Sequence, residues 1–300
     1  MDASVGAVSN LWLGTLDTNY NKSGQGRLSL FTNGNLVVSG ALFVGKEGKG
    51  FVQHNGGALT VNGTLTLAEQ TNSTGQYTLA NGTLYATQIL RGAGNGTFNF
   101  NGGQLGFAQF GSAARPLDLF NPNGTLALTN TLGTALLHGN FTNGNAATLS
   151  IRLGSTSNAI TVSSAAALAG NLSLAYAPGF QAAPGQQFVL LSAASVSGSF
   201  TNISLPPVGP DGLGLITSLT TTSVVATVAN FAPSFGPPTL DPNGSFQIGL
   251  TGIAGSRYLV QTATNLSGWT ALITNFVPFT FTVSNLAADS RRFYRAVYLP

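Results

Sequence analysis

Charged residues are scarce in this chain. Lysine and arginine together number 11 and aspartate and glutamate 8 among 300 residues, so 6% of the chain is charged, whereas an ordinary soluble domain is about 25% charged. The net charge of +3 is spread too thinly to build a groove that follows a phosphate backbone, which excludes nucleic acid as a partner. Solubility then depends on Asn, Thr, Ser, Gln and Gly, as is typical of extracellular repeat proteins.

Cysteine and long apolar runs are both absent. Without cysteine there are no disulfides and no thiolate metal sites, which suits a chain that crosses membranes unfolded into an oxidising space. No stretch of about 18 apolar residues exists, so we expect no transmembrane segment. Residues 1–7 lack the basic and apolar regions of a signal peptide, so export is expected to use a signal already removed or another route.

Groups that could perform catalysis are also few. The chain offers His54, His138 and eight carboxylates, and neither histidine has a partner at metal-ligand spacing. Aspartate is almost missing from residues 28–230, which excludes a calcium-binding nonapeptide repeat there. The sequence therefore predicts a protein without metal, cofactor or catalytic residues, and not an enzyme.

What the chain has is a repeat marked by Asn-Gly pairs. Leucines follow the first five pairs within two to four residues, at positions 36, 59, 84, 105 and 126, with spacings of 23, 25, 21 and 21. Such a period is typical of solenoids and arrays. The asparagines that we expect at the turns, where stacked side chains would form a ladder along the axis, are Asn33, Asn55, Asn81, Asn101, Asn123 and Asn143.

Between the turns, short segments alternate apolar and polar residues with a period of two, as in residues 59–67 and 97–100, which predicts strands and essentially no helix. Asn-Gly also marks hairpin turns in a β-sandwich, but hairpins do not require a register of about 22 residues. The expected fold is therefore all-β: a parallel β-solenoid (β-helix) of coils of about 22 residues, followed by a small antiparallel β-sandwich-like domain.

Two stretches, residues 74–84 (TGQYTLANGTL) and 94–105 (GNGTFNFNGGQL), resemble the autotransporter-associated β-strand repeat of secreted proteins from Gram-negative and Verrucomicrobia-like bacteria. The resemblance covers roughly residues 28–230 and implies a passenger-like β-solenoid at an extracellular location or on the cell surface. Residues 258–269 and 292–297 resemble small fibronectin-like C-terminal modules of the same bacteria.

These patterns divide the chain into four parts. Residues 1–27 are expected to cap the first coil or to add as a strand to another molecule, and residues 28–230 to form the solenoid. The prolines of 231–238 predict a stiff linker, and residues 239–300 the small β-sandwich-like domain. In that last part, Trp269, Tyr258, Tyr294 and Arg292 are candidates for contacting a glycan or a partner, although the aromatic residues also suit a sandwich core.

One pair of carboxylates could carry chemistry. Glu47 and Glu69 each follow an Asn-Gly asparagine by fourteen residues, so equivalent corners of adjacent coils are expected to hold them. Stacked there, they could bind calcium or serve catalysis, as in β-helix polysaccharide lyases and hydrolases. Their Gly-, Ser- and Thr-rich neighbours are instead typical of exposed loops, in which a charge is simply solvated.

Three functions follow from these observations. The first is a non-enzymatic extracellular structural protein that self-assembles, as a homopolymer, into a filament, sheath or surface layer through β-strand and solenoid-end contacts. The second is an adhesin or carbohydrate-binding passenger that contacts surface glycans. The third is a β-helix polysaccharide lyase or hydrolase.

Overall fold

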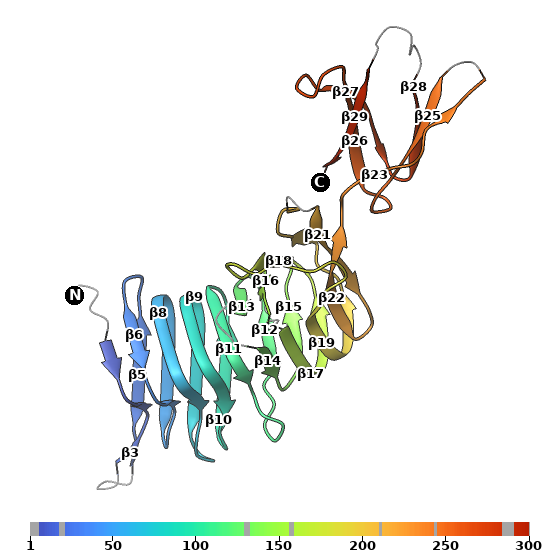
Figure 1. Cartoon of the computed structure of the whole chain (residues 1–300). Helices are drawn as coiled ribbons and strands as arrows, with labels where there is room; N and C mark the ends of the chain where they lie inside the picture. Colours follow the sequence, from blue (N-terminus) through green and yellow to red (C-terminus); the bar gives the residue numbers. More distant parts are fainter. Residues whose placement is uncertain are drawn as a thin grey trace. The chain divides into compact units, whose positions relative to one another are not determined.

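The chain is all-β, with a parallel β-solenoid followed by antiparallel sheets, as the sequence predicts (Figure 1). A computed structural model describes residues 6–17, 22–128, 133–155, 159–209, 212–242, 245–283 and 291–299. No helix long and apolar enough to span a bilayer occurs in these ranges.

Each complete coil of the solenoid contributes three strands, and equivalent strands of successive coils pair in parallel to give three ladders. Ladder A contains β5 (Gln25–Leu30), the first parts of β8 (Lys49–Leu67) and β9 (Thr74–Arg91), β10 (Asn95–Phe100), β12 (Leu119–Asn121), β15 (Phe141–Asn143), and the second parts of β17 (Ala159–Leu168) and β19 (Gln187–Gly198).

Ladder B contains the middle parts of β8 and β9 together with β1 (Gly6–Val8), β6 (Asn35–Val38), β11 (Gln104–Phe110), β13 (Thr125–Leu128), β16 (Thr148–Leu153), β18 (Asn171–Tyr176) and β20 (Asn202–Ser204). Ladder C contains the last parts of β8, β9 and β11 and the first parts of β17 and β19, together with β2 (Leu11–Leu13), β7 (Leu42–Val44) and β14 (Thr134–Leu137). A short antiparallel pair, β3 (Leu16–Asp17) with β4 (Lys22–Ser23), interrupts the first coil.

The repeated leucines set the register of the coils. Leu36 pairs with Leu59, and the column continues in ladder B through Leu84, Leu105 and Leu126, so the spacings seen in the sequence are the lengths of the coils. Leu59 and the three leucines after it are 0% exposed. Burying a leucine contributes about 1.5–3 kcal/mol, and a shift of one residue would turn the whole column outward, which is why this register is strongly specified.

Glycines with a positive φ line the corner between ladders A and B. They are Gly57, Gly82 and Gly103, with φ of 74°, 86° and 75°. A Cβ at any of them would overlap backbone of the coil before, so the corner needs glycine both for its conformation and for the close stacking of coils. Only Gly82 belongs to an Asn-Gly pair, whereas at the other two positions the glycine after the pair makes the turn.

The predicted asparagine ladder is formed at fewer positions than expected. Asn55 and Asn81 are register partners, but Asn143 pairs with Asn121, two residues before the predicted Asn123. In that pair, which is almost fully buried, Asn121 Nδ2 donates to Asn143 Oδ1 at 3.1 Å, and Asn143 Nδ2 donates to the carbonyl of Ala169 at 2.8 Å. The other five predicted asparagines are exposed, because their side chains point out of the corner.

This difference can be tested by substitution. Asn143→Ala is expected to destabilise the solenoid by about 1–3 kcal/mol, because it removes one of the two acceptors of the buried Asn121 amide, the other being the carbonyl of Gly124. Asn123→Ala, the matched control on an exposed asparagine, is expected to change the free energy of unfolding by less than about 0.5 kcal/mol. Urea denaturation followed by circular dichroism measures both, and equal effects of the two substitutions would contradict the assignment.

The last coil ends in an antiparallel strand. β21 (Leu213–Leu219) and β22 (Ser223–Asn230) are joined by a turn closed by the Thr220 N–H and the Ser223 carbonyl. β22 pairs with β19. Val196 N–H donates to the carbonyl of Thr221, and Val228 N–H donates to the carbonyl of Gln186. Residue numbers rise along one strand as they fall along the other, so the two strands are antiparallel. The parallel stacking of ladder C therefore stops at β22.

The division into units differs from the predicted boundary at residues 231–238. Residues 181–186, 207–216 and 227–230 belong to the second compact unit together with the rest of the chain. Within the predicted linker, β23 (Ser234–Phe235) pairs with β25, so part of this proline-rich stretch is a sheet strand.

The second unit contains two antiparallel sheets with a core between them. One sheet is formed by β23, β24 (Thr239–Leu240), β25 (Phe246–Thr251) and β28 (Phe279–Val283), and the other by β26 (Arg257–Ala263), β27 (Thr270–Phe276) and β29 (Phe293–Leu299). Residues of both sheets, among them Leu250, Phe281, Tyr258 and Val260, make one buried cluster. Face-to-face packing of this kind is that of a β-sandwich.

Candidate functional site

The outward side chains of ladder A form the candidate site. Because neighbouring side chains of a strand point to opposite faces, each strand places alternate residues outside. One outward column begins Arg27, Phe51, Gln76, Thr97, and a second begins Ser29, Gln53, Thr78, Asn99. Farther along the same ladder the columns contain Asp118, Asn140 and Ala165, and Phe120, Thr142 and Ala167. Of these fourteen residues only Arg27 and Asp118 are charged.

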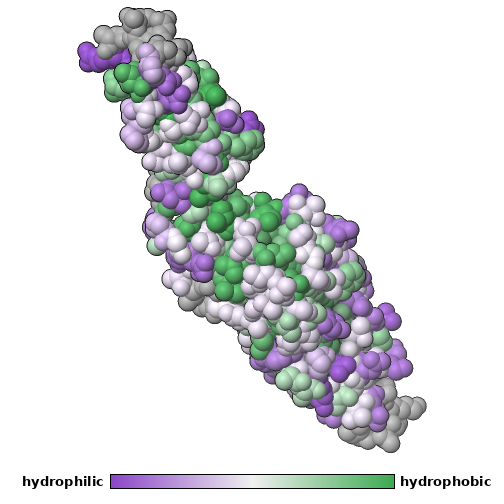
Figure 2. All heavy atoms as spheres, turned by 90° about the vertical axis from the view of Figure 1, so that its right-hand side faces the viewer, coloured by the Kyte–Doolittle hydropathy of each residue, from purple (hydrophilic) through white to green (hydrophobic). Residues whose placement is uncertain are grey.

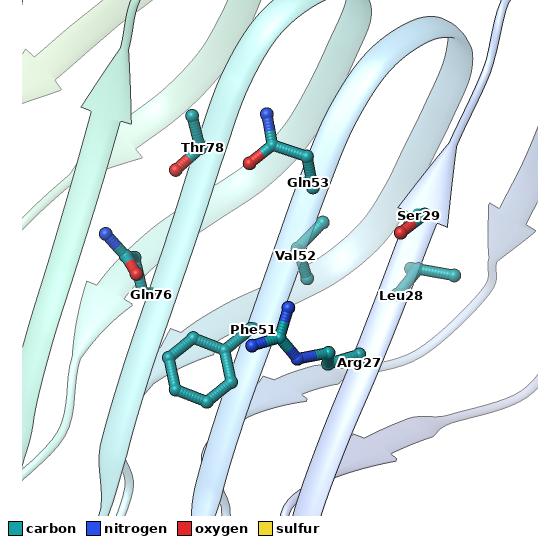
Figure 3. A pocket seen from close by; sticks show the side chains of 8 residues that line it. All are labelled: Arg27, Leu28, Ser29, Phe51, Val52, Gln53, Gln76 and Thr78. Atoms are coloured by element: carbon teal, nitrogen blue, oxygen red, sulfur yellow. The ribbon is translucent and has the colours of Figure 1, made fainter.

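One hollow on this face, hollow 1, has a volume of about 180 Å³ and lies over β5, β8 and β9. Figure 3 shows Arg27 beside Phe51, with Gln53, Gln76 and Thr78 around them. The guanidinium carbon of Arg27 lies 5.1 Å from the centre of the Phe51 ring, a cation–π contact that holds both side chains in place. Hollow 1 thus presents an aromatic ring next to amide and hydroxyl groups.

Another, hollow 2, has a volume of about 460 Å³ and lies over β12, β15 and β17. Its polar part is ordered by hydrogen bonds. Asp118 Oδ1 accepts from the backbone N–H and the side-chain Nδ2 of Asn140, at 2.8 and 3.1 Å, and Asn140 Oδ1 accepts from the backbone N–H of Ala165 at 3.2 Å. Phe120, 59% exposed, stands beside this network, and the short side chains of Ala165 and Ala167 leave the space open.

Together these groups can bind a ligand that carries many hydroxyl groups. Amides, hydroxyls and a carboxylate both donate to and accept from hydroxyl groups, and an aromatic ring packs against the apolar face of a sugar ring. Figure 2 shows, in one view of the surface, apolar and weakly polar residues with strongly hydrophilic ones scattered among them. A surface this poor in charge does not attract a polyanion or a polycation.

The aromatic residues predicted to contact a glycan in the second unit lie elsewhere than expected. Tyr258 is 0% exposed, and its hydroxyl donates to the carbonyl of Phe231 at 2.9 Å. Tyr294 packs against the core cluster. Both tyrosines occupy inward positions of their strands: Tyr258 is a core residue, and Tyr294 is partly buried against the core.

Trp269 and Arg292 are each half-buried. Trp269 is covered by Arg295, whose guanidinium carbon lies 4.4 Å from the ring centre. Arg292 has interactions of its own within the chain. The four predicted residues therefore do not form one platform.

The two glutamates lie at the same corner of adjacent coils but are out of register by one residue. Glu69 N–H donates to the carbonyl of Gly45, and Gln70 N–H donates to that of Lys46, so Glu69 stacks on Lys46 and not on Glu47. Lys46 itself turns to Trp12, with Nζ 4.1 Å from the ring centre. No group of three or more His, Cys, Asp or Glu side chains that could hold a metal ion occurs in the described ranges.

Sequence reasoning missed Phe51, Phe120, Asp118 and Asn140. The feature of the sequence that could have revealed them is which residues of each alternating strand point inward and which point outward. In residues 51–54 the inward positions are Val52 and His54, which places Phe51 outside, where an apolar residue is unexpected.

Comparison with protein-family models gives no match, and comparison with curated proteins gives no significant one. The class of protein is therefore defined by the fold alone: it is a parallel β-solenoid protein.

Proposed function

We propose that this chain is a non-enzymatic structural protein of an extracellular surface that binds neutral polysaccharide along the outer face of ladder A. The observation that carries the proposal is that both hollows lie on this one ladder and are lined by aromatic, amide and hydroxyl groups with little charge. A rigid solenoid repeats such groups at the strand spacing of about 4.8 Å, which suits a polymeric ligand better than a small molecule.

Binding without cleavage is supported by the carboxylates of the site. Hydrolysis of a glycoside usually needs two carboxyl groups on opposite sides of the bond. Among the residues that line the two hollows, Asp118 is the one carboxylate, and its Oδ1 already accepts two hydrogen bonds from Asn140. This arrangement orients Asp118 as an acceptor for ligand hydroxyls.

The extracellular location is supported by composition. A chain with no cysteine and 6% charged residues needs no reducing compartment and resists the aggregation that disulfide exchange brings. The filament that the sequence suggested receives less support, because β22 lies antiparallel on β19 at the C-terminal end of the ladders. A second molecule would have to displace β22 to continue parallel stacking in ladder C.

Affinity electrophoresis in gels that contain xylan, glucomannan, mixed-linkage β-glucan or starch tests the proposal. At least one polysaccharide is expected to retard the protein without release of reducing ends. Phe120→Ala is expected to weaken that binding at least about threefold, the loss of one aromatic packing contact.

The matched control is Phe31→Ala, which removes another exposed phenylalanine, outside both hollows. It is expected to leave retardation unchanged. If no polysaccharide retards the protein, or if both substitutions weaken binding equally, the site is not the outer face of ladder A.

A further inference from the structure

Resting on the proposed function, we infer that a single glycan chain lies along the solenoid axis, across the strands of ladder A, and occupies both hollows together. The ligand class is an extended, uncharged polysaccharide. A flat polar face would determine neither the direction nor the length of the bound chain, whereas two separate hollows can determine both.

The position of the hollows determines the direction. Hollow 1 is centred on β8 and hollow 2 on β15. Between them the ladder continues through β9, β10 and β12, so four steps of about 4.8 Å, about 19 Å in all, separate the two centres. A chain that followed one strand could reach only one hollow, whereas a chain that crosses the strands reaches both.

The surface between the hollows continues the same chemistry. Thr78 and Asn99 are register partners of adjacent strands, and Asn99 Nδ2 donates to Thr78 Oγ1 at 3.3 Å. Their outward oxygens and amide group carry no net charge. Since one pyranose unit is about as long as one strand spacing, each strand in this stretch can face one sugar.

The outer face of ladder A from hollow 1 to hollow 2, here called the track, differs in charge at its two ends. Hollow 1 ends in the guanidinium of Arg27, and hollow 2 contains the carboxylate of Asp118. The guanidinium of Arg27 can only donate hydrogen bonds and a carboxylate can only accept them. Although amides and hydroxyls at both ends donate and accept, this difference between the charged groups favours one direction of the bound chain.

Occupying both hollows has a measurable consequence. A short oligosaccharide fills one hollow and binds weakly, while a chain that spans about 19 Å engages the second hollow as an intramolecular step. We therefore expect affinity to rise steeply, by at least tenfold, once an oligomer reaches about five units, the number of strands from β8 to β15. Shorter oligomers are expected to bind with two molecules per protein, and longer ones with one.

Isothermal titration calorimetry on the full chain tests this with oligomers of two to eight units, prepared by partial acid hydrolysis of the polysaccharide that retards the protein. For the longest oligomer, Phe51→Ala or Phe120→Ala alone is expected to lower affinity to the level of the short ones. For a disaccharide or trisaccharide, each of these two substitutions is expected to remove one of the two binding sites, while Phe31→Ala is expected to remove neither site.

The outcomes separate the two proposals. If a polysaccharide retards the protein but its oligomers bind with an affinity that does not depend on length, the spanning chain is wrong and binding along ladder A stands. The same holds if the effects of the two substitutions on the longest oligomer are independent. If no polysaccharide retards the protein, both proposals are wrong. Circular dichroism of each variant shows that a lost site does not reflect a lost fold.

Discussion

Gly75→Ala is expected to lower the free energy of unfolding of the solenoid by about 3 kcal/mol. Gly75 lies in β9 between its register partners Gly50 and Gly96, at the corner where ladder C passes into ladder A. A Cβ at this position would overlap the carbonyl oxygen of Val44 and the amide nitrogen of Ala68. Both atoms belong to the backbone of packed coils, so no side chain can move aside to make room.

Tryptophan fluorescence during urea denaturation measures this effect. The chain has two tryptophans, Trp12 in the solenoid and Trp269 in the second unit, so a Trp269→Phe background leaves a reporter of the solenoid alone. The matched control is Gly6→Ala in β1, where the nearest atom to an added Cβ is Leu36 Cδ1 at 3.6 Å. The free energy of unfolding of the Gly6→Ala variant is expected to change by less than about 1 kcal/mol. An equal loss in both variants would show that close stacking of the coils is not the cause of the destabilisation by Gly75→Ala.

The second large effect is expected inside the solenoid, at His54 and Tyr77. Both side chains are 0% exposed. The nitrogen Nδ1 of His54 lies 2.8 Å from the Tyr77 hydroxyl, and Nε2 lies 3.4 Å from the carbonyl of Gly57. A carbonyl can only accept, so Nε2 carries the proton and Nδ1 accepts from the hydroxyl, which makes the pair neutral and fully bonded.

This pair gives the solenoid a dependence on pH. Burial lowers the pKa of His54 from its ordinary value of 6.5, so between the folded-state pKa and pH 6.5 the unfolded chain binds a proton that the folded chain does not. Stability is therefore fully present above about pH 6.5 and falls below it, by up to about 1.4 kcal/mol for each pH unit. Urea denaturation at a series of pH values from 8 down to 5 measures this slope.

Two variants separate the pair from other titrating groups. Tyr77→Phe is expected to cost about 1–3 kcal/mol at pH 7.5, since it leaves Nδ1 of His54 without its donor. The double variant His54→Leu with Tyr77→Phe removes both buried polar groups, so its stability is expected to exceed that of Tyr77→Phe and to lose the slope below pH 6.5. If the double variant keeps the wild-type slope, His54 is not its source.

The solenoid could be predicted because its determinants are local and repeated. Leu59, Leu84 and Leu105 recur at the coil length, and a period-two alternation between the turns allows strands and no helix. The same alternation also determines whether the side chain of Phe51 points outward, but this can be predicted only when the buried face of the strand is known. The glutamates show the limit of counting. Glu47 and Glu69 share a distance from their Asn-Gly pairs and still differ by one position in register, because in the coil of Glu69 one more residue, Gly57, lies between the Asn-Gly pair and the start of ladder B.

By itself, the sequence determined the class of fold, the length of the coils and the low charge of the surface, because each follows from residue type and spacing along the chain. Only the tertiary structure decided which asparagines pair, that Tyr258 lies in the core and Tyr294 packs against it, and that Phe51 and Phe120 line hollows on one face. Those features depend on the exact number of residues in each corner and on which strands stack over which. The strands of a ladder stay paired while the corners between them differ by a residue, so counting along the chain does not give which corner residues stack on one another.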